Sequence, residues 1–146
     1  MLKRYTFWLS AAVIFQFITG LIHSLSLFIT PKPDDATEGQ MLNMMTTYKM
    51  DMGGGFHPTF MNLFTALSSC FTFLCIFAAL TNGYLLWKHT EPSVMKGIIA
   101  INVVIFGSVF AMLLYFTFLP PIICVGLILI NLLAAFIVVP KVESAV

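Results

Sequence analysis

The sequence predicts an all-α fold, a four-helix transmembrane bundle with antiparallel neighbours, and three observations lead to this prediction. The chain of 146 residues is 60% hydrophobic and only 9% charged, whereas an ordinary soluble domain is about half apolar and about a quarter charged. Four stretches reach the length of about 20 apolar residues that a helix needs to cross a bilayer. None of the four contains Asp, Glu, Lys or Arg. We therefore expect lipid to surround most of this chain.

The first span is expected over Phe7–Ile29, shortly after the basic pair Lys3-Arg4. A basic pair before an apolar run is also typical of a secretory signal peptide, whose apolar region is only about 7 to 15 residues long. This run has the length of a complete span and contains Gln16 and His23. We therefore interpret it as a retained transmembrane helix.

Three further spans are expected at Thr59–Leu80, Gly97–Leu119 and Pro121–Val139. Apolar residues continue after Leu80, so the first of these spans ends either at Leu80 or at Trp87. Backbone groups in lipid must be hydrogen-bonded within their own segment, and the runs lack the alternating pattern of a membrane barrel. All are therefore expected to be helices. Short connections favour antiparallel packing of sequential helices, and we expect residues 1–146 to form one membrane domain.

The loop at residues 30–57 is the long connection, and part of it has helical periodicity. Between Gln40 and Met52 the apolar residues that recur at helical spacing are Met41, Met44, Met45, Tyr48 and Met52. The segments Pro31–Asp35 and Gly53–Gly55 on either side are typical of turns and hinges. The pattern predicts a short amphipathic helix at the outer membrane interface, or a lid over the outer end of the bundle.

The orientation of the spans is predicted from the basic side chains, which are enriched in cytoplasmic loops. If the N-terminus is cytoplasmic, five basic residues lie inside: Lys3, Arg4, Lys88, Lys96 and Lys141. Only Lys32 and Lys49 then lie outside. This distribution favours both termini in the cytoplasm and the 30–57 loop on the outer side.

Each span carries a few uncharged polar or histidine side chains, including Asn102 on the third, and such groups usually face the interior of a membrane bundle. Our candidate ligand site is an outward polar cavity formed by Gln16, His23, Asn62, Thr65 and Asn131, with His57 at its mouth. A rise of about 1.5 Å per residue places His23 about 9 Å inside the outer end of its span. In this hypothesis Gln16 and Asn131 form the floor of the cavity.

The same residue types also have a structural interpretation. Polar side chains commonly form hydrogen bonds between membrane helices, worth about 0.6 kcal/mol each on average, and small residues such as Gly20, Gly107 and Gly126 allow close packing. His23 stands apart, because a buried imidazole needs both a donor and an acceptor partner, or a ligand.

These residues leave two cofactor chemistries open. Haem ligation would use His23 and His57, although a transmembrane haem needs axial ligands at matched depth. Copper(I) would use the thioethers of the loop methionines, although methionine on an amphipathic helix is usually an apolar contact. The loop methionines are Met41, Met44, Met45, Met50 and Met52.

The placement of charge and of cysteine argues against several function classes. The spans lack the charged side chains that a membrane hydrolase or transferase normally places around a headgroup site. A net charge of +1 with no basic cluster beyond Lys3-Arg4 excludes a nucleic-acid partner. The three cysteines, Cys70, Cys75 and Cys124, lie in apolar surroundings without a Cys-x-x-Cys pattern, so we expect them to pack rather than react.

The first half of the chain resembles small bacterial four-helix inner-membrane proteins of the DoxX-like kind. The resemblance rests on the sequence around Gly20 to His23, on Met44-Met45, and on the opening of the second span at residues 62–68. It implies a four-helix topology and a bacterial inner membrane, and it implies no activity. In that family the second helix opens with an acidic residue and a Gly-Phe-Ser step, whereas this chain has Asn62 and Ala66-Leu67-Ser68.

Together these features predict a non-enzymatic multi-pass membrane protein with an outward polar cavity centred on His23. It would bind a small apolar ligand or serve as an accessory subunit of a membrane complex, with lipids, a membrane protein or a second copy as partners. The alternative hypothesis is a cofactor-dependent membrane oxidoreductase that uses haem, quinone or copper with His23 and His57.

Overall fold

A computed structural model describes residues 4–29 and 32–140, and these residues form five helices without a named strand. The helices are α1 (Tyr5–Ser26), α2 (Ala36–Thr47), α3 (Phe60–Trp87), α4 (Pro92–Phe116) and α5 (Leu119–Val138). The predicted all-α class is confirmed for this part of the chain. Two of the basic residues used to predict the orientation, Lys3 and Lys141, lie outside the described residues. The start of the long loop, at residues 30–31, also lies outside them.

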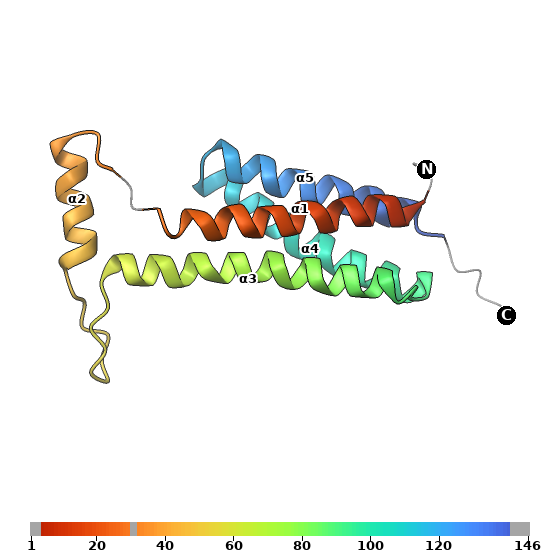
Figure 1. Cartoon of the computed structure of the whole chain (residues 1–146), viewed down its shortest axis with the longest axis horizontal. Helices are drawn as coiled ribbons and strands as arrows, with labels where there is room; N and C mark the ends of the chain where they lie inside the picture. Colours follow the sequence, from red (N-terminus) through yellow and green to blue (C-terminus); the bar gives the residue numbers. More distant parts are fainter. Residues whose placement is uncertain (1–3, 30–31, 141–146) are drawn as a thin grey trace.

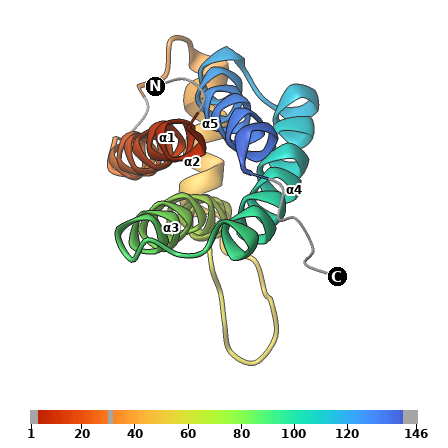
Figure 2. The same ribbon diagram turned by 90° about the vertical axis from the view of Figure 1, so that its right-hand side faces the viewer.

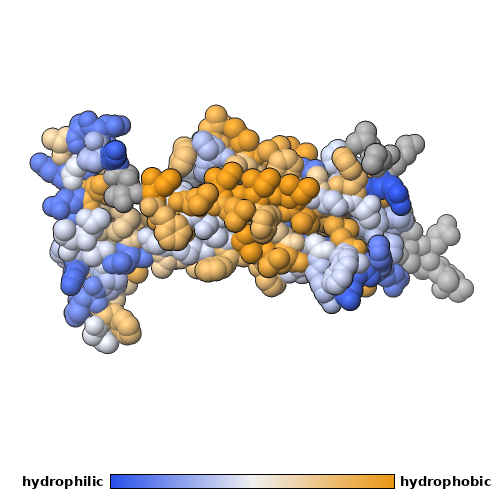
Figure 3. Space-filling model, in the orientation of Figure 1, coloured by the Kyte–Doolittle hydropathy of each residue, from blue (hydrophilic) through white to orange (hydrophobic). Residues whose placement is uncertain are grey.

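Four of the five helices in the described ranges, α1, α3, α4 and α5, are long and apolar enough to cross a membrane. At most 28% of the residues in the apolar window of any one of them are buried, so most of their apolar side chains face outward. Figure 3 shows the result as a hydrophobic band between two hydrophilic ends. A surface of this kind is stable against lipid rather than water, which supports a multi-pass membrane protein.

The four long helices are arranged around α1 and α5. α1 packs against α3 on one side and α5 on the other, and α5 also packs against α4. α3 and α4 share few contacts although they follow each other in the chain (Figure 2). In Figure 1, α1 begins and α5 ends at the end of the molecule where α3 turns into α4, and α2 lies across the opposite end. Fully buried residues such as Leu9, Phe106 and Leu132 form the core.

Close approach between helices depends on two of the three small residues named above. A Cβ atom at Gly20 would lie 2.8 Å from Cδ1 of Ile76 and 3.3 Å from Cβ of Cys75. A Cβ at Gly126 would lie 3.2 Å from Phe110, whereas one at Gly107 would make only an ordinary contact. The packing interpretation is thus confirmed for Gly20, between α1 and α3, and for Gly126, between α4 and α5.

Three helix boundaries can be compared directly with the predicted ones. α1 ends at Ser26, three residues before the predicted end. α4 begins at Pro92, five residues before the predicted start, because proline is well suited to the first turn of a helix. α3 continues to Trp87, so the longer of the two predicted ends is the right one.

The loop segment with helical periodicity does form a helix, but its predicted range of Gln40–Met52 was wrong at both ends. α2 begins earlier because the side chain of Asp35 accepts a hydrogen bond from the Glu38 amide at 2.8 Å, while the Glu38 carboxylate accepts one from the Asp34 amide. The helix ends at Thr47, so the predicted apolar positions at 48 and 52 lie outside it. None of the residues of α2 is buried.

Residues 49–59 form a narrow hairpin between α2 and α3. Lys49 and Thr59 form an antiparallel bridge, and the Met50 amide donates to the Pro58 carbonyl at 2.9 Å. Gly53–Gly55 at the tip all have positive φ, a conformation that glycine adopts without steric cost. Figure 2 shows this hairpin projecting beyond the four long helices.

Candidate functional site

His23 lies in the last turn of α1 and faces α3. Its Nε2 donates to the carbonyl oxygen of Ser68 at 3.1 Å, because a carbonyl can only accept. The imidazole packs edge-on against Phe71, with 5.1 Å between ring centroids. Since α1 ends at Ser26, His23 is about 4.5 Å rather than 9 Å from the end of its helix, at about 1.5 Å per residue. The predicted distance from His23 to the end of its helix was therefore too long.

Gln16 takes part in a cluster of three amide side chains that we call the amide cluster: Gln16 of α1, Asn82 of α3 and Asn102 of α4. Nδ2 of Asn82 donates to Oε1 of Gln16 and to Oδ1 of Asn102, both at 3.2 Å. Nδ2 of Asn102 donates back to Oδ1 of Asn82 at 3.4 Å and to the Ile98 carbonyl at 2.9 Å. Nε2 of Gln16 completes the cluster with a longer bond of 3.5 Å to Asn102.

The amide cluster satisfies its own polar groups and links three helices. Gln16 and Asn82 are fully buried, and each amide nitrogen and oxygen of the three side chains has a partner within the cluster or on the backbone. The cluster bridges α3 and α4, which otherwise share few contacts. Its chemistry is that of a satisfied hydrogen-bond network, which specifies how helices pair.

Asn82 was not among the predicted site residues, although the length of the second apolar run gives a signal for it. With the second span ending at Leu80, Asn82 falls outside the hydrocarbon. If the continuation to Trp87 is included, Asn82 becomes an intramembrane amide like Gln16 and Asn102. Such residues usually face the interior of a bundle.

Two other predicted residues make hydrogen bonds within their own helix or its cap. Oδ1 of Asn62 accepts from the amide and the hydroxyl of Thr59, at 3.0 and 2.6 Å, and the Thr59 hydroxyl accepts from the Asn62 amide. This is a capping box that starts α3. Nδ2 of Asn131, which is buried, donates to the Leu127 carbonyl one turn earlier on α5.

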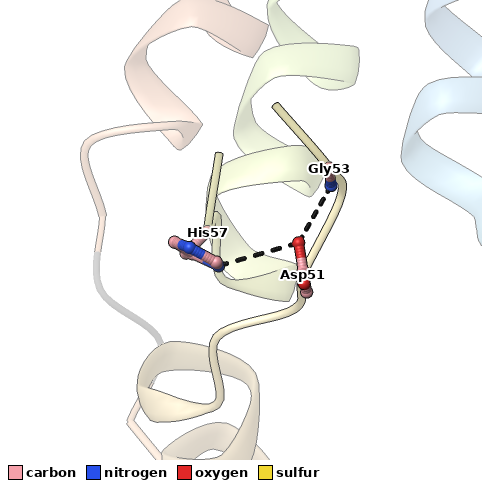
Figure 4. Close-up of polar contacts among 3 residues, drawn as sticks. All are labelled: Asp51, Gly53 and His57. Carbon is pink, nitrogen blue, oxygen red and sulfur yellow. Dashed lines mark hydrogen bonds and ion pairs between the residues drawn. The ribbon is translucent and has the colours of Figure 1, made fainter. Parts of the chain in front are cut away.

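His57 lies on the hairpin at residues 49–59 and is exposed. Its Nδ1 is 4.0 Å from a carboxylate oxygen of Asp51, and the same oxygen accepts from the Gly53 amide at 2.9 Å (Figure 4). The two side chains are 54% and 78% exposed. At this distance and exposure the pair contributes little to stability.

The six predicted site residues therefore do not form one cluster of interacting side chains. Among the residues that the structure describes, no hydrogen bond, ion pair or ring contact joins one of the six to another. The six residues are Gln16, His23, His57, Asn62, Thr65 and Asn131. In particular, Gln16 meets Asn82 and Asn102 rather than Asn131, and His23 and His57 have different partners.

A cavity of about 430 Å³ lies at the α2 end of the molecule. It is lined by the residues after α1, by one face of α2 and by the first turns of α3: Leu27, Phe28, Ile29, Gly39, Leu42, Asn43, Thr46, Met61 and Thr65. Of the six predicted residues, Thr65 contributes to this lining. The lining is mainly apolar with a few polar groups, and the volume falls within the range of about 300 to 1,000 Å³ that is usual for small-molecule sites.

The described residues contain no group of three or more His, Cys, Asp or Glu side chains placed to hold a metal ion. Cys70 is exposed, Cys75 is buried and Cys124 is half-buried, and all three are free thiols. The packing expected for the cysteines thus holds for Cys75, whereas Cys70 faces outward.

Comparison with known proteins identifies no relative. No family model, no curated protein and no solved structure matches the chain.

Proposed function

We propose that this chain is a non-enzymatic multi-pass membrane protein that binds a small apolar or amphiphilic molecule in the cavity beside α2. The observation that carries the proposal is the cavity itself. It lies at the boundary between apolar helices and a polar end, and it combines apolar walls from Leu42 and Met61 with the polar groups of Asn43, Thr46 and Thr65.

The position of α2 supports this site. α2 contacts α3, has no buried residue and lies across one end of the molecule (Figure 1). A helix in this position would lie in the membrane interface and cover the cavity. Access then requires α2 to shift by breaking few contacts, as expected for a segment of low local stability.

His23 is placed near this cavity by the chain itself, because Leu27 to Ile29, which line it, directly follow the last turn of α1. In this proposal His23 fixes the end of α1 against α3. Its contacts to Ser68 and Phe71 hold the segment that forms one wall of the cavity.

The proposal includes an orientation in a bacterial inner membrane with both termini in the cytoplasm and sequential spans antiparallel. Arg4 precedes α1, Lys88 follows α3 and Lys96 lies near the start of α4, so these three basic residues belong to one end of the molecule. Lys32 and Lys49 flank α2 at the other end. This distribution supports the α2 end as the outer one. A relation to DoxX-like proteins stays a prediction from the sequence.

Photolabelling tests the cavity. The full-length protein in lipid nanodiscs would be irradiated with a fatty acid that carries a terminal diazirine, and labelled peptides would be identified by mass spectrometry. We expect labelling in the peptides that contain α2 and the first turns of α3. Thr46→Trp should lower this labelling several-fold, because the introduced indole fills space that Thr46 lines and the Thr46 hydroxyl bonds only within α2.

The matched control is Thr47→Trp. Thr47 is the next residue on α2, its hydroxyl also bonds within the helix, and it does not line the cavity. This variant should label like the unaltered protein. Equal labelling of both variants, or labelling confined to the outer surfaces of α4 and α5, would contradict the proposed site.

A further inference from the structure

A second hollow lies on the lipid-facing side of the molecule, between α1 and α3. It is a groove of about 520 Å³ lined by Val13, Ile14, Phe17, Ile18, Ala79, Leu80, Gly83, Tyr84 and Trp87. Apart from the Tyr84 hydroxyl and the Trp87 indole N–H, the lining side chains are apolar. The groove runs toward the end of the molecule where α1 begins and α3 ends, away from the cavity beside α2.

Gly83 keeps this groove open. A Cβ at this position would lie 3.6 Å from Cγ1 of Val13, an ordinary contact, so a small side chain is tolerated and a large one must occupy the groove. The rim residues Ile14 and Leu80 are 56% and 62% exposed. They therefore face whatever surrounds the bundle rather than its core.

One end of the groove carries the features of a headgroup layer. Tyr84 and Trp87 pack edge-to-face with 6.1 Å between centroids, and aromatic residues of this kind gather where lipid meets water. Nζ of Lys88 lies 4.8 Å from the centroid of Trp87 and 5.8 Å from that of Tyr84. In the part of the chain that the structure describes, the single ion pair joins His57 and Asp51, so Lys88 has no carboxylate partner.

From this geometry we infer that the groove between α1 and α3 binds an anionic phospholipid, with an acyl chain along Phe17 and Leu80 and the phosphate beside Lys88. The apolar lining matches a hydrocarbon chain, and the ammonium at the rim matches a negative headgroup. Tyr84 and Trp87 lie between the two, where the lipid changes from apolar to polar. This site lies apart from the cavity beside α2 and does not depend on the function proposed for that cavity.

Native mass spectrometry of the full-length protein with added lipid tests the inference. The probes are phosphatidylglycerol, which is anionic, and phosphatidylcholine with the same acyl chains, which has no net charge. The unaltered protein should retain phosphatidylglycerol in preference. Lys88→Gln should lower that preference about fivefold, the factor corresponding to one lysine at an anionic surface. Lys96→Gln removes a charge at the same end, but Lys96 lies over Phe136 of α5, so this control should keep the preference.

A second pair of variants tests the acyl-chain part of the groove. Gly83→Phe should lower retention of both lipids, whereas Gly97→Phe, at a glycine with open space around its Cβ position, should not. If Gly83→Phe does not fold, Ile14→Asn replaces it, with Ile101→Asn as control because both isoleucines are 56% exposed. The inference is overturned if the unaltered protein shows no preference for phosphatidylglycerol, if Lys88→Gln and Lys96→Gln behave alike, or if the groove variants bind like their controls.

Discussion

Polar side chains in two regions of this molecule differ in the range of their hydrogen bonds, which join separate helices in one region and close local turns in the other. In the amide cluster, buried Gln16 and Asn82 bond to each other and to Asn102 across 20 to 86 residues of sequence, so three helices are fixed together. At the α2 end the side chains of Asp35, Asp51 and Asn62 bond within three residues and stay exposed. The same kinds of group specify tertiary packing in one region and only local turns and caps in the other.

The difference follows from the solvent of each region. An amide in hydrocarbon has no water to bond, so it must find a partner on another helix or on its own backbone. An exposed polar group is hydrated whether or not it finds a protein partner, so its hydrogen bonds add little. We therefore expect substitutions among the long helices to change global stability and substitutions at the α2 end to act locally.

Gly20→Leu is expected to have the largest effect, because it separates α1 from α3. The Cβ atom alone would lie 2.8 Å from Ile76 and 3.3 Å from Cys75, and the remaining atoms of leucine need further space. Overpacking of a core commonly costs about 1 to 3 kcal/mol and occasionally more. Thermal unfolding in detergent, followed by circular dichroism, should show a clear loss of stability. Gly97→Leu, at an open position, should unfold like the unaltered protein; equal losses in both variants would mean that α1 and α3 do not need this close approach.

Asn82→Leu is expected to have an intermediate effect. It removes the side chain that donates to both Gln16 and Asn102, and it leaves a buried amide oxygen of Gln16 without its donor. Interhelical hydrogen bonds in membranes are worth about 0.6 kcal/mol on average and at most about 1.7, so we expect a loss of about 1 to 2 kcal/mol. Reversible unfolding in mixed detergent micelles would measure it.

Two further variants decide whether that loss belongs to the amide cluster. Asn131→Leu removes a buried amide that bonds only to its own helix, so it should cost less than Asn82→Leu. In a double-mutant cycle, Asn102→Leu should cost less in the Asn82→Leu background than in the unaltered protein, because its two hydrogen bonds with Asn82 are already lost and only the longer bond from Gln16 remains between helices. Strict additivity of the two losses would show that the hydrogen bonds between α3 and α4 do not stabilise the fold.

The fold class was predictable from the sequence because it depends on properties of each segment by itself and not on which other segments it contacts. Apolar length and the absence of charge identify the four spans whichever helices they contact. Boundaries were less predictable, since they depend on individual hydrogen bonds. The side chain of Asp35 caps α2 and so sets a start four residues before the predicted one, whereas α3 begins directly after its cap Thr59, within one residue of the predicted start.

The site was harder to predict because sequence spacing places residues on one helix and cannot say which helix lies opposite. Gln16, Asn62 and Asn131 all qualified as intramembrane amides, yet Gln16 faces Asn82, Asn62 caps its own helix and Asn131 bonds one turn back. Which helices pair depends on where two helices can approach closely, as α1 and α3 do at Gly20. Sequential helices need not pair closely, since α3 and α4 share few contacts. Both are properties of the assembled bundle.

The smallest effect on global stability is expected at Asp51, where two variants separate the turn hydrogen bond from the contact with His57. Asp51→Asn keeps an oxygen that can accept from the Gly53 amide but loses the charge that faces His57, whereas Asp51→Ala loses both. Because the side chains are exposed, neither variant should change the free energy of unfolding by more than about 0.5 kcal/mol.

Hydrogen exchange should nevertheless distinguish the two Asp51 variants. In the hairpin at residues 49–59, the amides of Met50 and Met52 donate across the ribbon to Pro58 and Phe56. Loss of the turn acceptor in Asp51→Ala should speed their exchange, while Asp51→Asn should leave it unchanged. Faster exchange in both variants would mean that the contact between the Asp51 carboxylate and His57, rather than the turn at Gly53, orders the hairpin. A loss of global stability in either variant would mean that the hairpin is coupled to the packing of the four long helices and does not act only locally.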